Sequence, residues 1–557
     1  MYLGHVQGLG RRVMYWSGCY HCEMQGIRTR VINERKQGFT EKGARLIAAW
    51  RGWRQLPTNV KLQGMREYAM SHSGSKRALY LAALLTIQLR GIRKSDFAIQ
   101  AFAKVEAVDV IKKYGERSLV PDCHCLGDCL CSCGAECRLI QFRRREGALY
   151  WRQVVGPVEA VFYCLENTTP GQCDAIERVS LGSFGKGRDS LSTGELLWST
   201  YSRLAQRGKV VILLLDCSRA DAHIGKELQN WFMDMVRHMT CREGQEIVDL
   251  VRDWLIDPPR NKSMAGIEYT TKPVLRSGDM HTSLMANVLF WAKYNMYIDN
   301  VCTSTPEAQA VRDDMGWEGP PATPGTIATD INGDDVVLMC NEECAENVHR
   351  TIGTFMSWFG VDLRVDGRTE VFEETEWCQA RPVRTPAGFR QVRDPWKVMS
   401  VALAGPKWAH LTPKLKDRRI ATIGACELIL NRGVPVLQEW ALALLRSVDV
   451  GEVGFDQLDY TQSSYWRCRI ELGKLGGELR VISPEEIVHS TRVSFNLAFG
   501  MTIAEQVAYE RILRGWHPGR GPIKRDDFSW WTGRFMSPIN HETAVGTAAE
   551  RNDEEQI

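Results

Sequence analysis

The sequence predicts an α+β fold, in which a β-hairpin and a buried strand pack against helices. Mostly apolar residues at 326–331 and 336–339 flank Asn332-Gly333, and an Asn-Gly pair between two such runs indicates a hairpin with a tight turn. Residues 210–215 are six apolar residues without polar alternation, which is typical of a strand buried on both faces. A helical pattern follows at 225–239.

Acidic residues stand at the end of both β elements. Asp216 follows the predicted strand, and Asp334 and Asp335 follow Gly333 at the hairpin tip. Gly and Asp are ordinary turn residues, so the tip alone would also fit a solvated hairpin. If the strands are neighbours, however, the carboxylates converge and repel each other unless divalent cations neutralise them. We therefore predict Asp216, Asp334 and Asp335 as ligands of two Mg²⁺ (or Mn²⁺) ions that support nucleotidyl transfer.

A third segment lies between these two sites. A Ser277-Gly278 turn leads into a helical pattern that carries small and polar residues up to Asn287 and continues with the apolar residues 288–291. In isolation this segment fits a loop followed by an N-capped core helix. The order strand-Asp, Ser-Gly helix and Gly-Asp-Asp hairpin is much more specific than any one of the three.

In this order the segments resemble motifs A, B and C of viral RNA-dependent RNA polymerases, and in particular the tombusvirus-like (carmovirus-like) group. Residues 216–221, Asp-Cys-Ser-Arg-Ala-Asp, are similar to the family pattern Asp-x-Ser-Arg-x-Asp. Residues 277–282 are similar to Ser-Gly-Asp-Met-Asn-Thr, with His281 in place of the Asn. Residues 138–143 resemble motif F, 376–382 the motif E turn, and 423–438 and 492–500 the thumb segments.

The resemblance implies a right-hand polymerase of fingers, palm and thumb, with an antiparallel palm sheet packed by helices. It places the fingers at 51–195, with a Cys-rich loop at 123–137 and the motif F region at 138–145. The palm would be 196–400, with a fingers insertion near 240–272, and the thumb 401–535. Residues 1–50 form an extension of unknown role, and 536–557 are expected to be a disordered tail. The implied activity is RNA-directed RNA synthesis that replicates a positive-strand viral genome, with primer-independent initiation.

The resemblance also implies binding residues. The group for the nucleotide and its ribose 2′-hydroxyl is Asp221, Ser277, Gly278, Asp279, Thr282 and Asn287; the group for triphosphate and template is Arg138, Arg143, Lys186 and Arg364.

Two of these residues depart from the family pattern. The family Asn lies four residues after the Thr, whereas Asn287 lies five after Thr282, a rotation of about 100° on a helix. Arg364 stands where motif D offers a Lys, and an Arg, whose pKa exceeds 12, could only stabilise charge there.

Cysteines are concentrated immediately before Arg138. Six cysteines and His124 fall within fifteen residues: Cys123, Cys125, Cys129, Cys131, Cys133 and Cys137. Thiolates and imidazole are preferred ligands of structural zinc. Spacings of one or three residues do not match a pair of two-residue knuckles, so a loop of reduced, partly buried cysteines is the alternative.

The amino-acid composition argues against some classes of protein. The 557 residues include 70 Lys and Arg against 67 Asp and Glu, a net charge of +3, which argues against a coat protein with a basic arm. Eighteen mostly isolated cysteines suit a reducing compartment. No signal peptide is evident. The longest apolar run, 78–89, is short of the ~20 residues that cross a bilayer, and predicts a buried helix.

These features predict a soluble protein in the host cytoplasm. The resemblance adds membrane-associated replication complexes, in which a membrane-anchored viral replication protein and host factors are partners beside template and product RNA and nucleoside triphosphates. Two alternatives are open. A reverse transcriptase shares motifs A and C, but its hairpin carries an aromatic residue where this chain has Asn332. A non-catalytic, cysteine-rich RNA-binding replication factor would use the carboxylates structurally.

Overall fold

The computed structural model divides into two compact units, each described here by itself. The larger unit contains Gly10–Lys186 and Leu215–Asp366, and the smaller one contains Gly187–Leu214 and Gly367–Ile557, with Met1–Leu9. The structure describes residues 12–14, 18, 20–27, 39–72, 74–103, 107–109, 139–163, 182–218, 220–271, 273–401, 412–448 and 483–516.

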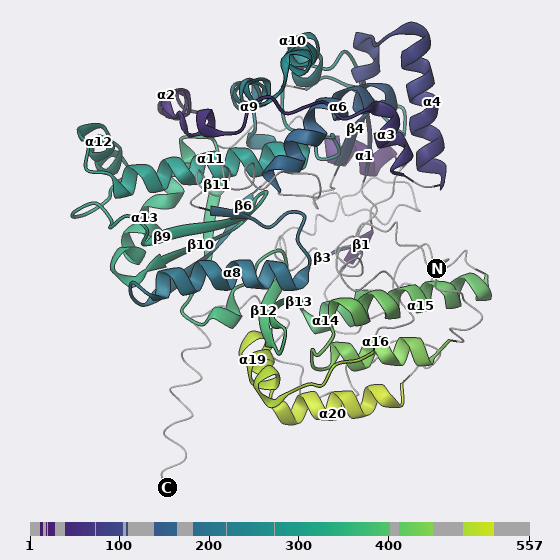
Figure 1. The fold of residues 1–557 in the computed structure, drawn as a ribbon, viewed down its shortest axis with the longest axis vertical. Helices are drawn as coiled ribbons and strands as arrows, with labels where there is room; N and C mark the ends of the chain where they lie inside the picture. Colours follow the sequence, from purple (N-terminus) through teal and green to yellow (C-terminus); the bar gives the residue numbers. More distant parts are fainter. Residues whose placement is uncertain are drawn as a thin grey trace. The chain divides into compact units, whose positions relative to one another are not determined.

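A five-stranded sheet lies mostly in the larger unit, and its strands β6 and β11 have residues in both units (Figure 1). Its strand order is β11 (Asp362–Thr369), β6 (Val210–Ser218), β10 (Asp335–Asn341), β9 (Ile327–Asn332) and β5 (Gly182–Phe184). Strands β9 and β10 form the predicted antiparallel hairpin, with Asp335 opposite Asn332. Strand β6 confirms the strand predicted at 210–215.

One edge strand, which precedes the residues predicted for the palm, pairs in parallel with the sheet. Strand β5 pairs in parallel with β9, and Gly182 lies opposite Thr329. Since β5 and β9 are far apart in sequence, no hairpin fixes their relative direction, and a crossover connection permits parallel pairing.

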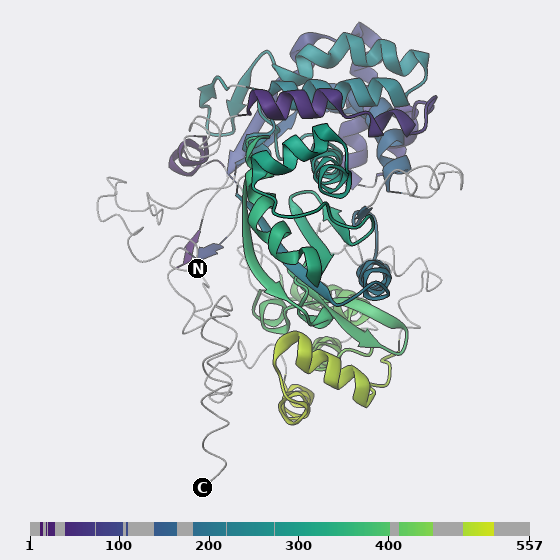
Figure 2. The same ribbon diagram turned by 90° about the vertical axis from the view of Figure 1, so that its left-hand side faces the viewer.

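Helices pack on this sheet (Figure 1, Figure 2). Helix α11 (Thr282–Cys302) packs against β9, and α13 (Glu342–Ser357) against β10. Helix α11 is apolar around most of its circumference, as expected for a helix with neighbours on all sides. It also contacts α2 (Glu41–Ala49), α9 (Lys226–Met239) and α12 (Pro306–Met315). Helix α9 confirms the helical pattern at 225–239.

A second sheet of the larger unit has four strands. Their order is β4 (Leu139–Arg143), β2 (Ile99–Ala103), β7 (Asn261–Ser263) and β8 (Glu268–Tyr269). Strand β2 pairs antiparallel with β4 and parallel with β7. Helix α1 (Tyr20–Ile27) contacts β2 and β4. The other elements of the larger unit include α3 (Met65–Met70), α4 (Gly74–Arg90), α6 (Arg145–Phe162), α10 (Arg242–Ile256) and a separate two-stranded sheet of β1 (Arg12–Met14) and β3 (Ala107–Asp109).

Helix α4 differs from the buried helix predicted at 78–89. It buries Tyr80 and Leu84, whereas Leu85 and Leu89 are 56% and 78% exposed. The run is therefore buried on one side only, and Leu85 and Leu89 are apolar residues on its solvent side. Within the part of the chain that the structure describes, no helix combines the length and the hydropathy needed to cross a bilayer.

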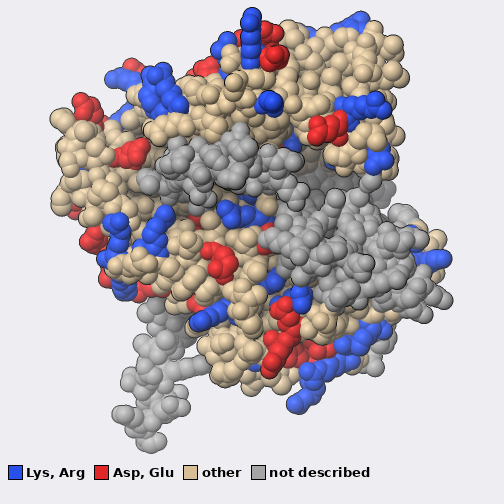
Figure 3. All heavy atoms as spheres, in the orientation of Figure 1, with Lys and Arg blue, Asp and Glu red and all other residues tan. Residues whose placement is uncertain are grey.

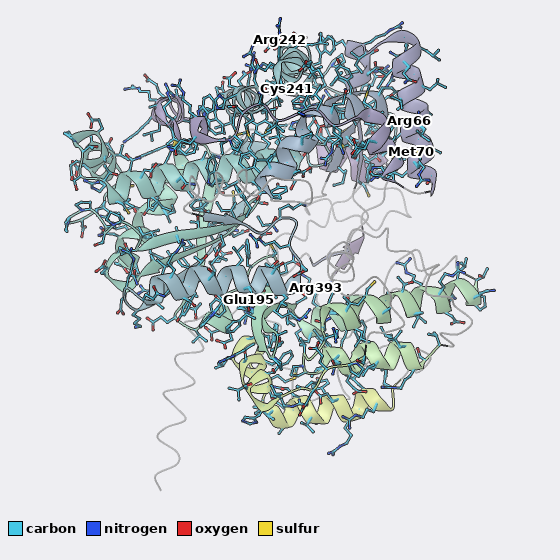
Figure 4. All side chains as sticks on the ribbon, viewed as in Figure 1. Arg66, Met70, Glu195, Cys241, Arg242 and Arg393 are labelled. Atoms are coloured by element: carbon cyan, nitrogen blue, oxygen red, sulfur yellow. The ribbon has the colours of Figure 1, made fainter. Side chains whose placement is uncertain are left out.

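The smaller unit packs helices around a two-stranded antiparallel sheet. Helix α8 (Ser190–Ala205) lies so close to β13 (Gly388–Arg393) that a Cβ on Gly194 would be 2.1 Å from the Phe389 carbonyl oxygen. Glu195, labelled in Figure 4 with Arg393, accepts a hydrogen bond from the Phe389 N–H. The other elements are β12 (Ala380–Thr385), α14 (Pro395–Val401), α15 (Pro413–Leu430), α16 (Leu437–Arg446), α19 (His489–Phe499) and α20 (Ile503–Arg514).

Mixed helix and sheet in both units confirms the α+β class. The core of the smaller unit includes Val383, Trp440, Phe495 and Tyr509, all without exposed surface. On the face drawn in Figure 3, Lys and Arg side chains are interspersed with Asp and Glu over the described surface, in keeping with the near-neutral net charge.

Candidate active site

The two predicted acidic positions lie on neighbouring strands of the five-stranded sheet. Asp216 is at the end of β6, and Asp334 and Asp335 are at the β9–β10 turn; β6 pairs with β10. All three carboxylates are exposed. The Cys217 thiol reports their proximity: burial raises its pKa to about 12, and the charges of Asp334 and Asp216 act on it in the same direction.

The turn that carries Asp334 has a defined backbone. Gly333 has φ 74°, whereas Asp334 is not among the residues with positive φ. Positive φ at the first central residue alone is the pattern of a type II′ turn, which suits the twist of a hairpin. A side chain at position 333 would therefore be strained, and the Gly before the two carboxylates is required by the backbone.

Arg364 forms an ion pair with one of the three acidic residues. Its Nη2 lies 2.7 Å from Asp216 Oδ2, and the two side chains are 62% and 52% exposed. This hydrogen bond raises the pKa of Arg364, so the guanidinium stays charged. Farther along β11, burial and the charge of Asp216 raise the pKa of Asp366. Arg364, predicted as a triphosphate ligand, thus contacts Asp216 at the end of β6.

The carboxylates are of the right chemical class for Mg²⁺, which takes oxygen ligands. Among the described residues, no three His, Cys, Asp or Glu side chains are close enough together to hold a metal ion. Mg²⁺ is usually bound through one or two carboxylates, with water and substrate phosphates completing its shell, so this arrangement is compatible with the ion. The metal assignment of Asp216, Asp334 and Asp335 stays a prediction.

The motif B loop is attached to strand β4. Ser277 Oγ donates to the Leu139 carbonyl oxygen at 3.1 Å, and Gly278 N–H donates to that of Gln141 at 2.9 Å. A Cβ on Gly278 would be 2.7 Å from the Gln141 oxygen, so only Gly fits. Thr282 Oγ1 donates to the Arg276 carbonyl oxygen. The hydroxyl groups of Ser277 and Thr282 thus both donate hydrogen bonds to backbone carbonyl oxygens.

Arg143 and Asp279 form a buried ion pair, which does not fit their predicted contacts with triphosphate and ribose. Arg143 Nη2 lies 2.6 Å from Asp279 Oδ2, and Nε donates to Oδ1 at 2.9 Å. Arg143 also donates to the carbonyl oxygens of Phe97, Trp254 and Leu255, and its side chain is 1% exposed. Burial disfavours the charged form of Asp279, but the attraction of the Arg143 charge outweighs this effect. The pKa of Asp279 is therefore lowered. The pair fixes the motif B loop to the helices and strands around β4.

His281 is a neutral core residue. It lies against Phe232, and its Nδ1 accepts a hydrogen bond from Trp151 Nε1 at 3.0 Å. Burial lowers its pKa to about 4. The imidazole therefore acts as an acceptor at the position where the resembled motif has Asn.

Asn287 lies beneath the catalytic turn. Its Oδ1 accepts a hydrogen bond from Gly333 N–H at 2.9 Å, and its side chain is buried. The structure thus joins the third predicted segment directly to the hairpin.

Comparison with known proteins agrees with this arrangement. A family model described as viral RNA dependent RNA polymerase matches residues 327–520, beginning at the first residue of β9. The chain thus resembles the viral RNA-dependent RNA polymerases. It is 23% identical over 475 residues to the RNA-directed RNA polymerase of maize chlorotic mottle virus (84% of this chain, 41% of the relative). For melon necrotic spot virus the identity is 24% over 454 residues (79% and 48%), and for tobacco necrosis virus strain D 23% over 487 (85% and 56%).

These relatives confirm the predicted resemblance to the tombusvirus-like polymerases. The chain spans about half the length of the curated relatives it matches.

Several predicted residues of the polymerase cannot be placed. Arg138 and the six cysteines from Cys123 to Cys137 lie outside the described residues, as does the side chain of Asp221, whose backbone is in a 3₁₀ turn at Ala220–His223. Lys186 follows edge strand β5 and is half-buried.

Sequence reasoning missed two residues near the site. Tyr163, at the end of α6, accepts a hydrogen bond from Asn287 Nδ2, and no local pattern in the sequence indicated it. Lys293 is fully buried in α11, and burial lowers its pKa to about 8. A single Lys within an otherwise apolar helical run was the available signal for this residue.

Proposed function

We propose that this chain carries the catalytic part of an RNA-directed RNA polymerase that replicates a positive-strand viral genome. One observation supports this most strongly: Asp216 and the Asp334-Asp335 turn lie on paired strands within a chain that resembles the viral RNA-dependent RNA polymerases. We assign the fingers to 51–195, the palm to 196–400 and the thumb to 401–535, in a right-hand arrangement.

In this proposal the carboxylates of Asp216 and Asp334, assisted by Asp335, hold two Mg²⁺ or Mn²⁺ ions. When bound, such ions stabilise the attacking and leaving oxygens of an in-line phosphoryl displacement. Arg364 has to leave Asp216 for this to happen, and its charge is then available to the triphosphate. Asp221 recognises the ribose 2′-hydroxyl, which is both donor and acceptor. Base selection is left to pairing with the template.

We further propose primer-independent initiation, and action within membrane-associated replication complexes of the host cytoplasm. In this proposal the membrane contact comes from a viral replication protein. Host factors complete the complex.

The test is RNA synthesis by purified protein on a defined template without primer, with Mg²⁺ and either ribo- or deoxyribonucleoside triphosphates. The proposal predicts magnesium-dependent incorporation of ribonucleotides from the template's 3′ end. Preferential incorporation of deoxyribonucleotides would favour a reverse transcriptase. RNA binding without any incorporation, with or without a primer, would favour the non-catalytic replication factor.

A further inference from the structure

The catalytic turn contains a backbone donor that the hairpin itself cannot satisfy. Strands β9 and β10 close on the Asn332–Asp335 pair, so Gly333 and Asp334 are the two central residues. The N–H of the first central residue of such a turn takes no part in the ladder, and a buried N–H without an acceptor is costly. Here the acceptor is Asn287 Oδ1, at 2.9 Å from Gly333 N.

The amide of Asn287 is itself held on its other side. Its Nδ2 donates to the Ser283 carbonyl oxygen at 2.8 Å, one helical turn back, and to the Tyr163 hydroxyl at 3.1 Å. Both N–H groups of the Asn287 amide and one acceptor position of its oxygen are thus hydrogen-bonded, and the residue is 1% exposed. An amide so buried cannot reach the ribose of a nucleotide in the cleft without leaving these partners.

The one-residue displacement of the Asn along α11 accounts for this contact. The usual spacing after Thr282 would put the amide at position 286, which is Ala in this chain. A Cβ built on Gly333 would be 4.0 Å from the Ala286 Cβ, so the small residue lies under the turn beside Asn287. The shift turns the amide toward the turn backbone.

Tyr163 connects this contact to another element. It follows the last residue of α6, the helix that begins directly after β4. Burial raises the pKa of its hydroxyl, so it remains protonated and can hydrogen-bond to Ser283 and Asn287 together. Helix α6, helix α11 and the catalytic turn are therefore joined through two side chains of the larger unit.

We infer that Asn287 is a positioning residue that holds the Asp334-Asp335 turn, and that it does not read the ribose. The inference rests on the proposed polymerase function for its kinetic consequences, but the contact itself can be tested without activity.

The primary variant is Asn287→Ala, and the matched control is Asn300→Ala. Asn300 lies on the same helix, and its Nδ2 likewise donates to the carbonyl oxygen one turn back, that of Met296 at 2.7 Å. We expect hydrogen exchange at the Gly333 amide to accelerate roughly tenfold or more in Asn287→Ala and to stay unchanged in the control, because one net hydrogen bond is lost. Asn287→Asp keeps an oxygen acceptor and should retain slow exchange.

In steady-state synthesis, Asn287→Ala should lower kcat by roughly tenfold or more while KM for the nucleotide and the preference for ribo- over deoxyribonucleotides change little. Tyr163→Phe, which leaves the Gly333 contact in place, should give a smaller change in the same direction; it also serves if Asn287→Ala fails to fold. Loss of sugar preference with unchanged exchange at Gly333 would overturn the inference. Unchanged exchange in every variant would also overturn it. Exchange is measured without substrate, so a wild-type protein that makes no RNA would refute the proposed function and leave this test intact.

Discussion

Arg364 forms an ion pair of 2.7 Å with Asp216 near the end of β6. A carboxylate oxygen that accepts from a guanidinium is not free for a cation, so the two ligands compete. Because both side chains are more than half exposed, the pair is worth ~0.2–1 kcal/mol, which a divalent ion can readily overcome.

We therefore expect Arg364→Ala to bind Mn²⁺ up to about fivefold more tightly in the absence of nucleotide, while its rate of RNA synthesis falls because the triphosphate loses a positive charge. Mn²⁺ titration followed by electron paramagnetic resonance measures the first effect. Arg350→Ala is the control, since it removes another exposed ion pair, between Arg350 on α13 and Glu318 in the loop after α12. Equal Mn²⁺ affinity in Arg364→Ala and wild type would contradict the competition.

Asp334→Asn should leave the fold intact and abolish synthesis. The change preserves shape and removes the charge that a metal ion requires, at a cost of several kcal/mol in the transition state. Single-nucleotide incorporation and circular dichroism measure the two properties. Asp253→Asn, at an exposed position of α10, is the matched control. Activity of Asp334→Asn within about tenfold of wild type would rule out its assignment as a principal ligand.

Arg143→Met should destabilise the protein by about 3–5 kcal/mol, because it leaves the Asp279 charge buried without its partner. Combining it with Asp279→Asn should recover part of the loss, which denaturant unfolding of the two single variants and the double variant will measure. The exposed pair Arg237–Asp249 provides the control, for which Arg237→Ala should cost under ~1 kcal/mol. Strictly additive losses in the double variant would contradict a coupled pair.

The protein should become less stable as the pH is lowered, because of His281. Its pKa is about 4 in the folded chain and 6.5 when unperturbed, so the unfolded state binds more protons between these values. Folding free energy is then lost as the pH drops from about 6.5 toward about 4, by at most about 3 kcal/mol. His281→Asn should flatten this window, whereas His349→Asn, at an exposed site of α13, should not. Denaturant unfolding at several pH values decides between them.

We propose that the cysteines from Cys123 to Cys137 bind one structural zinc that braces the segment before Arg138. Purified protein should then contain about one equivalent of zinc, and chelation should weaken nucleotide affinity before the rest of the chain unfolds. Elemental analysis measures the content, with Cys129→Ser as the site variant and Cys241→Ser as a control outside the cluster. Less than about half an equivalent, together with unchanged activity of Cys129→Ser, would leave a loop of reduced cysteines.

Local sequence patterns predicted the elements that carry the acidic residues, because strand burial and turn type depend on residues that are neighbours in the sequence. The hairpin at Gly333 and the strand before Asp216 are of this kind. The edge strand β5 has three residues and no periodicity to detect, so its parallel pairing was not foreseen.

Burial of charged residues could not be predicted in the same way. Arg143 begins a run of three arginines that looks solvated, yet its partner Asp279 is 136 residues away in sequence. The helical spacing of Asn287 indicated that its side chain was rotated relative to the family position. Its hydrogen-bond partners, Tyr163 and Gly333, could not be predicted, because only the tertiary structure brings them together.

The protonated thiol of Cys217 has a practical consequence for labelling. Maleimides and iodoacetamides react with thiolates, and a buried thiol whose pKa is about 12 supplies almost none at neutral pH. Fluorophores attached through cysteine should therefore spare the residue next to Asp216, even without mutating it. Cys241, Cys302 and Cys378 are partly exposed, but burial raises the pKa of Cys302 to about 12. Cys241 and Cys378 would therefore compete for dye, and replacing these two by Ser is the first step toward a protein labelled at one chosen position.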